Sequence, residues 1–195
     1  MKLILASASP RRHEILSLAG LDHEIRPSDA DESNVSYIPG HPENFVTELA
    51  KRKAKAVPAG EDEIILSADT VVYVPGNEEI LGKPKDRDDA VRMLTLLSGS
   101  THKVITGVCI ADAAGIREAF SVTSDVHFRN LSPDEITEYI DRCRPYDKAG
   151  AYGIQEGACH FVDGITGDYY NIVGLPIAPV YTRLRPYFAG HSKAD

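Results

Sequence analysis

The chain has 195 residues, of which 43% are hydrophobic and 26% are charged, a composition typical of a folded globular protein and unlike that of a disordered chain. Its formal net charge of -8 disfavours non-specific binding to nucleic acid, so no nucleic-acid partner is expected. No apolar run approaches the roughly 20 residues of a membrane-spanning helix, so no membrane partner is expected either.

The first predicted element is a short buried strand over the apolar run 3–6, and a helix follows it. Ser9 is a good N-cap, and Pro10 suits the first helical turn. Arg11 and Arg12 come next, where the partial positive charge of a helix N-terminus makes cations unfavourable unless an anion joins them. The free backbone N–H groups and the two guanidinium groups therefore predict a phosphate-binding turn. The alternative is an ordinary capped helix with two solvated arginines.

The rest of the chain alternates helical and strand patterns, which predicts an α/β fold. Hairpins require antiparallel pairing, so the sheet should be mixed. The predicted segments, in order, are a loop over 27–42, a helix over 43–57, strands over 64–66 and 71–74, a helix over 86–99, a strand pair over 103–111 and 116–128, a helix after the capping box 132–135, a hairpin over 159–173 and a helix over 175–184.

Two charged residues interrupt apolar patterns. Lys53 lies on the apolar stripe of its helix, where it either extends along the surface to water or meets a fixed carboxylate or phosphate. Asp69 separates two strand-like runs, and an ionised carboxylate there costs several kcal/mol unless a cation or hydrogen bonds compensate it. A turn between two strands would explain Asp69, but Thr70 and Val71 are poor turn residues, which favours a functional role.

Two further segments carry polar groups on restricted backbone. Pro84 limits the movement of Lys83, which adds another cation. The segment 147–155 combines two glycines, both charges and Gln155, whose amide offers a donor and an acceptor. That pattern is typical of backbone that closely approaches a ligand, although a structural loop with a surface pair between Asp147 and Lys148 would also explain it.

Taken together, these motifs resemble the Maf family of nucleoside triphosphate pyrophosphatases. The resemblance covers nearly the whole length as one domain, 1–195. It is carried by several motifs in one order: Leu5 to Arg12, Asp31-Glu32, Leu49-Ala50 with Lys53-Ala54, Ala68 to Val72, Gly82-Lys83-Pro84, Leu97-Ser98-Gly99 with His102, Asp147 to Gln155, and Gly174-Leu175-Pro176.

The resemblance implies an elongated α/β structure in which a mixed sheet with flanking helices forms two lobes around a nucleotide cleft, similar to inosine triphosphate pyrophosphatases. It implies hydrolysis of a nucleoside triphosphate to the monophosphate and pyrophosphate, with a divalent cation, Mg²⁺ or Mn²⁺. Arg11, Thr70 and Gln155 match the branch that acts on dTTP and UTP, with room for modified pyrimidine nucleotides. The branch that acts on 7-methyl-GTP differs at those positions.

The resemblance also assigns roles to individual residues. Asp69 would be the general base, or a metal-bound carboxylate that orients water, and Glu32 would help to hold the metal. Arg11, Thr70 and Gln155 would read the base. The residues that would bind phosphate oxygens or stabilise their charge are Ser9, Arg12, Lys53 and Lys83.

Two other functions remain open from the sequence. One is a non-enzymatic regulator of septum formation or cell division that acts by binding a protein, and the other is the same chemistry on a modified purine triphosphate. The family suggests a homodimer. Three widely spaced cysteines without a C-x-x-C pair suggest free thiols in a reducing cytoplasm.

Overall fold

The computed structural model describes residues 1–188. Its first half comprises β1 (Lys2–Leu5), α1 (Pro10–Leu18), β2 (His23–Ile25), α2 (Pro42–Ala56), β3 (Glu63–Val74), β4 (Glu79–Leu81) and α3 (Arg87–Leu97). Its second half comprises β5 (Thr101–Asp112), β6 (Gly115–Phe128), α4 (Pro133–Cys143), three short turns η1 (Ala149–Ala151), η2 (Ile154–Ala158) and η3 (Cys159–Phe161), then β7 (Val162–Thr166), α5 (Tyr169–Val173) and α6 (Ile177–Phe188). Within residues 1–188, no helix combines the length and the apolar character needed to cross a membrane.

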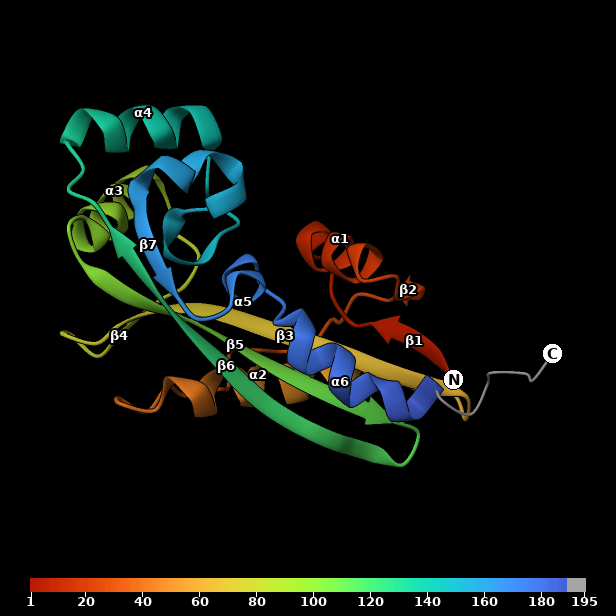
Figure 1. Cartoon of the computed structure of the whole chain (residues 1–195). Coiled ribbons are helices and arrows are strands. Elements are labelled where there is room, and N and C mark those ends of the chain that lie inside the picture. The colour runs from red at the N-terminus through yellow and green to blue at the C-terminus, as the bar shows by residue number, and fades with distance from the viewer. Residues whose placement is uncertain (189–195) are drawn as a thin grey trace.

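The strands form one mixed sheet in the order β2-β1-β3-β5-β6-β7, and β4 pairs with β3 outside this path. β1 runs parallel to both β2 and β3, whereas β3, β5, β6 and β7 pair antiparallel with one another. Figure 1 shows that the long strands β3, β5 and β6 run through the length of the molecule. The prediction of a mixed α/β sheet is therefore confirmed.

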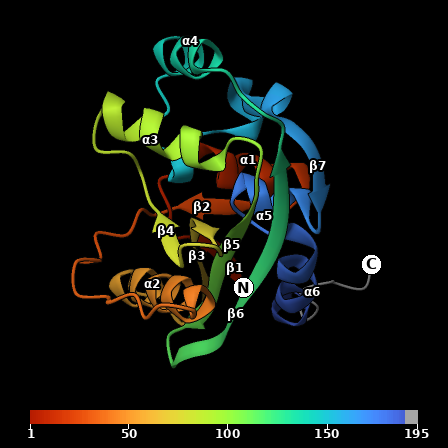
Figure 2. The same ribbon diagram turned by 90° about the vertical axis from the view of Figure 1, so that its left-hand side faces the viewer.

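Helices cover both faces of the sheet. Ala50 and Ala54 of α2 pack against Ile65 of β3 on one face. Leu16 of α1 and Leu184 of α6 belong to a separate cluster on the other face. Figure 2 shows α2 and α6 on opposite sides of the long strands. This alternation follows from strand geometry, because successive side chains of β3 point to opposite faces.

The apolar core is divided along β3. Ala68 still belongs to the cluster with α1 and α6, whereas Val72 belongs to a second large cluster with α3, α4 and the η turns. Asp69 and Thr70 therefore lie where one core ends and the next begins, and both are partly buried. The sheet is continuous there, since β3 runs without a turn from Glu63 to Val74.

Most predicted elements are present, and one is wrong. The capping box of α4 forms both of its hydrogen bonds, and Asp86 caps α3 by accepting from the backbone N–H of Asp89. The hairpin predicted over 159–173 does not form: β7 pairs with β6, and the chain then enters α5. The carboxylate of Asp168 accepts the N–H groups of Tyr170 and Asn171, which starts a helix in place of a second strand.

Gly107 of β5 lets α2 approach the sheet closely. It stands opposite Asp69 in the β3–β5 register, so both face α2. A Cβ atom at this position would lie 2.4 Å from the backbone C and O atoms of Val46 in α2. Val46 is two helical turns before Lys53, and the close approach therefore helps to bring Lys53 to Asp69.

We expect Gly107→Ala to lower the free energy of unfolding by about 3 kcal/mol, because a backbone contact of this kind can be relieved only by moving α2. Gly164→Ala in β7 is the matched control, since its Cβ would meet only the ring of His127 at 3.7 Å. Urea denaturation of the two variants checks the prediction. Equal midpoints for the two variants would contradict it.

Candidate active site

The strand order changes direction at the carboxyl end of β1, which makes this end a topological switch point. From β1 the chain passes through α1 to β2 on one side and later through α2 to β3 on the other, with the two helices on opposite faces. Ligands of open α/β sheets bind at such a switch point. One edge of β3 faces β1. On this edge β3 pairs with β1 up to Leu66 and with β4 from Val72 onwards. Between them, the stretch 67–71 pairs with no strand of residues 1–188 on this edge.

Arg12 is buried at this switch point and donates hydrogen bonds to three residues. Its Nε donates to the carbonyl oxygen of Gly174 at 2.9 Å, and its Nη1 donates to Oγ of Ser7 at 3.0 Å. Its Nη2 donates to Oγ1 of Thr70 at 3.2 Å. Thr70 in turn exchanges a hydrogen bond of 2.9 Å with Thr106 on β5. The guanidinium plane is therefore fixed by partners from three distant parts of the chain.

All three acceptors of Arg12 are neutral, although Arg12 is only 9% exposed. Within the described residues it forms no ion pair with a carboxylate. Burial lowers the pKa of the guanidinium, and the negative charge of nearby Asp69 acts in the opposite direction. A desolvated cation without an anionic partner is costly, and a bound phosphate would compensate it.

The N-terminus of α1 adds free donors beside Arg12. Ser9 is the N-cap residue as predicted, but its side chain makes no capping hydrogen bond, and no acidic residue lies in the first turn. The backbone N–H of Ser9 instead donates to Oγ of Ser7 at 3.2 Å. The Ser9 hydroxyl and the first N–H groups of α1 thus remain open to an anion, as they are in phosphate sites at helix N-termini.

Lys53 joins the two predicted acidic residues. Its Nζ donates to Oδ1 of Asp69 at 2.6 Å and contacts Oε1 of Glu32 at 3.2 Å. The side chains of Lys53 and Asp69 are both 15% exposed, whereas Glu32 is more open. The predicted carboxylate partner of Lys53 is therefore present. Asp69 faces α2 while Thr70, the next residue in β3, faces Arg12, so the strand links the two clusters.

The carboxylates of Glu32 and Asp69 could serve as ligands of a divalent cation only if further ligands come from outside the described part of the chain. Within residues 1–188 no group of three or more His, Cys, Asp or Glu side chains could hold a metal by itself. Mg²⁺, however, is usually bound by one or two carboxylates together with phosphate oxygens and water. Two carboxylates that converge on one ammonium group match that donor set.

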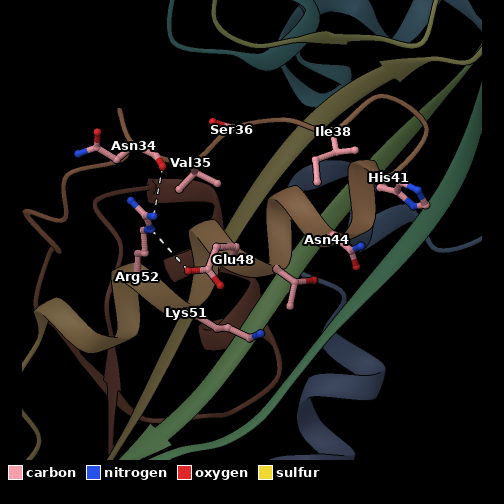
Figure 3. A pocket seen from close by; sticks show the side chains of 10 residues that line it. Asn34, Val35, Ser36, Ile38, His41, Asn44, Glu48, Lys51 and Arg52 are labelled. Carbon is pink, nitrogen blue, oxygen red and sulfur yellow. Dashed lines mark hydrogen bonds and ion pairs between the residues drawn. The ribbon is translucent and has the colours of Figure 1, made fainter.

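The loop that carries Glu32 lies against α2. Arg52 of α2 donates to the backbone carbonyl oxygens of Asp31 and Asn34 at 3.4 and 3.3 Å, and it contacts Glu48 at 3.5 Å. Figure 3 shows Arg52 with Asn34 and Glu48 beside a cavity of about 390 Å³ between the loop and α2. Its lining comes from the loop and from the outer surface of α2, including Lys51, and none of the predicted site residues lines it.

Arg11 turns away from Arg12 towards the segment before and within η2. Its Nη1 lies 2.8 Å from Oε1 of Glu156 and 3.5 Å from Oδ2 of Asp147. Lys148 lies between the same two carboxylates, at 2.7 Å from each. We refer to Arg11, Asp147, Lys148 and Glu156 as the Lys148 cluster. It connects the start of α1 with the lobe that contains α3 and α4.

The remaining predicted residues are more open. Lys83 and Gln155 are exposed, and neither side chain forms a hydrogen bond or ion pair within the described part of the chain. The loop of Lys83 touches the 147–155 segment, because the N–H of Gly150 donates to the carbonyl oxygen of Gly82 at 3.0 Å. Thr70, predicted beside Arg11 and Gln155, is bonded to Arg12.

Several site residues were not identified from the sequence. Ser7 and Gly174 lie inside recognised motifs, but only the fold shows that both accept hydrogen bonds from Arg12. The alternative explanation of a surface pair between Asp147 and Lys148 is wrong in one respect: the pair forms, but Lys148 is only 6% exposed. Its neighbouring glycines were the available signal, because close packing of a long side chain over backbone requires them.

Comparisons with known proteins identify the family of the chain. A model of the family described as Maf-like protein matches residues 2–187. A relative from Anaeromyxobacter sp. (strain Fw109-5), named dTTP/UTP pyrophosphatase, is 46% identical over 195 residues, which cover 97% of this chain and 90% of the relative. A relative of the same name from Thermococcus gammatolerans is 48% identical, with 92% and 93% covered.

A solved structure shows the same fold at low sequence identity. The Ham1 protein of Staphylococcus aureus superposes with a TM-score of 0.52 at 12% identity, over 98% of this chain and 100% of that chain. The likeness supports the architecture of a long mixed sheet with helices on both faces. By the family model and by relatives of 44–48% identity over most of its length, the chain belongs to the Maf-like protein family.

Proposed function

We propose that this protein is a nucleoside triphosphate pyrophosphatase that hydrolyses dTTP and UTP to the nucleoside monophosphate and pyrophosphate. The observation that carries the proposal is the buried guanidinium of Arg12, which has only neutral partners and lies close to the Lys53–Asp69–Glu32 cluster. Arg12 needs an anion as its partner, and Asp69 offers a carboxylate that would orient water. The names of the relatives support the same substrates.

The reaction needs a water molecule directed at the α-phosphorus. Asp69 would orient this water and accept its proton as the new P–O bond forms, while the bond to the pyrophosphate oxygen breaks. Lys53 holds the Asp69 carboxylate in place at 2.6 Å and brings positive charge to the same point. Arg12, Ser9 and the N–H groups of α1 would bind the phosphate oxygens, and Lys83 would add a further cation.

Glu32 and Asp69 would hold Mg²⁺ or Mn²⁺ together with phosphate oxygens of the nucleotide. Such a cation, when bound, neutralises charge on the phosphates and lowers the pKa of coordinated water. Arg11, Thr70 and Gln155 would read the base. A uracil-type edge presents a carbonyl, an N–H and a second carbonyl, and these side chains offer complementary donors and an acceptor.

We expect dTTP and UTP to be cleaved only in the presence of a divalent cation, because the two carboxylates otherwise bond to Lys53. The measurement is product analysis for dTTP, UTP, dCTP, dGTP and 7-methyl-GTP with Mg²⁺ or Mn²⁺. Monophosphate and pyrophosphate should be the products. Diphosphate with orthophosphate would refute the proposed bond cleavage, full activity in excess chelator would refute the metal, and faster cleavage of 7-methyl-GTP would favour the purine alternative.

The same panel separates the enzyme from a protein-binding regulator of cell division, because a binding module needs neither Asp69 nor a cation. We further propose that the enzyme acts in the cytoplasm as a homodimer. Sedimentation equilibrium across a range of concentrations tests the dimer, and a single species of 21.3 kDa would refute it.

A further inference from the structure

The Lys148 cluster contains two cations and two carboxylates; both carboxylates contact both cations, and Glu156 is the closer bridge because it lies 2.8 Å from Arg11, against 3.5 Å for Asp147. One carboxylate oxygen of Glu156, Oε1, contacts Nη1 of Arg11 at 2.8 Å, and the other, Oε2, contacts Nζ of Lys148 at 2.7 Å. Each oxygen therefore serves a different cation. Because Glu156 directly follows Gln155, the same backbone that places this carboxylate also places the Gln155 amide.

Lys148 is held rigidly beneath this bridge. Its side chain is 6% exposed, and its ammonium group is bonded to both Asp147 and Glu156. A Cβ atom at Gly153 would lie 2.7 Å from Cε of Lys148, so the lysine stem packs directly on the backbone there. The N–H of Gly153 also donates to the hydroxyl of Tyr139 at 3.1 Å. The segment that carries Gln155 is thus anchored at Gly153 by the stem of Lys148 and by the hydroxyl of Tyr139.

Arg11 retains donors for a ligand while the cluster holds it. Both of its contacts use Nη1, and within residues 1–188 its Nε and Nη2 donate no hydrogen bond. Glu156 therefore fixes the direction of the guanidinium without using all of its N–H groups. A side chain fixed in this way loses little conformational entropy when a ligand binds.

We propose that Glu156, anchored by Lys148, is a positioning residue for substrate selection. Glu156 holds the guanidinium of Arg11 in one arrangement beside the neighbouring Gln155, so that a pyrimidine base meets both groups at once. The inference rests on the proposed function, since it takes Arg11 and Gln155 as the groups that read the base. The inference adds two residues, Glu156 and Lys148, which touch no substrate and act through Arg11.

The test is a double-mutant cycle with Glu156→Ala, Arg11→Ala and the double variant, and it measures kcat/KM for UTP and dGTP. We expect Glu156→Ala to reduce the preference for UTP by roughly 3- to 10-fold through KM, with little change in kcat. The double variant should match Arg11→Ala alone, because Glu156 acts only through Arg11. Glu156→Gln, which keeps an oxygen for one cation, should recover part of the preference.

Glu118→Ala is the matched control. Glu118 forms an ion pair with Arg183 and has a side-chain exposure of 45%, against 44% for Glu156. It should leave the preference unchanged. Lys148→Met tests the anchor: the preference should fall as in Glu156→Ala, with the thermal unfolding midpoint recorded to separate loss of folding from loss of selection.

The outcomes distinguish the two proposals. A wild-type protein that prefers UTP, with Glu156→Ala equal to Glu118→Ala, would overturn the positioning role and leave the proposed function standing. Additive losses in the double variant would overturn it in the same way. A wild-type protein without preference for UTP over dGTP would refute the proposed substrates and, with them, this inference.

Discussion

Asp69→Asn should reduce turnover of dTTP and UTP by about 10²–10⁴-fold while the protein stays folded. Asparagine has nearly the same shape, but it cannot take a proton from water and carries no charge to hold a cation. Lys53 would keep its contact with Glu32 at 3.2 Å, so the substitution does not leave a buried ammonium group without a partner. Steady-state kinetics with saturating Mg²⁺ and circular dichroism make the measurement.

Asp125→Asn provides the matched control for this prediction. Asp125 of β6 forms a comparable ion pair with Lys103 of β5 at 2.8 Å, away from the residues that we assign to catalysis. Turnover of this variant should stay close to that of the wild type. Should Asp69→Asn retain more than a tenth of wild-type turnover, Asp69 would not be the catalytic carboxylate.

Arg12→Lys should lower kcat/KM for every nucleotide by roughly 10²–10³-fold, because each substrate carries the same triphosphate. Lysine keeps the charge but cannot reproduce the planar fork that bonds to Ser7, Thr70 and Gly174. The ratio of pyrimidine to purine activity should not change. A thermal unfolding curve controls for lost folding, and Arg92→Lys, on the exposed face of α3, controls for arginine replacement in general.

Arg11→Ala, unlike Arg12→Lys, should change the ratio of pyrimidine to purine activity, although the two arginines are adjacent. Neighbouring residues of a helix point about 100° apart, and here the guanidinium of Arg12 bonds to Gly174 while that of Arg11 faces Glu156. The loss of a charged hydrogen bond to the base should shift the preference for pyrimidines by roughly 1.5–3 kcal/mol. Equal losses for all nucleotides would make Arg11 a second phosphate ligand.

The local elements follow from the sequence because their signals are local. The N-cap Ser9 and the first residue Pro10 of α1, the apolar stripe of α2 and the capping box of α4 act within a few residues, and each gives the predicted element. The hairpin over 159–173 is the exception. There the side chain of Asp168 caps α5, and this local hydrogen bonding forms a helix in place of the strand that the pattern predicted.

The sequence by itself also identified which residues carry unusual charge. Lys53 and Asp69 were singled out because each interrupts an apolar pattern, and the structure places them 2.6 Å apart. A charge in an apolar pattern is costly wherever the chain goes, so its need for a partner can be deduced without a fold.

Only the tertiary structure decided which residues share a site. Asp69 and Thr70 are adjacent in sequence, but Asp69 bonds to Lys53 of α2 and Thr70 bonds to Arg12 of α1, because strand side chains alternate between faces. Arg11 meets Glu156 and Arg12 meets Gly174 because segments more than a hundred residues apart come together at the end of β1. Such meetings depend on strand order and register, and these are set by the packing of the whole core and not by any local pattern.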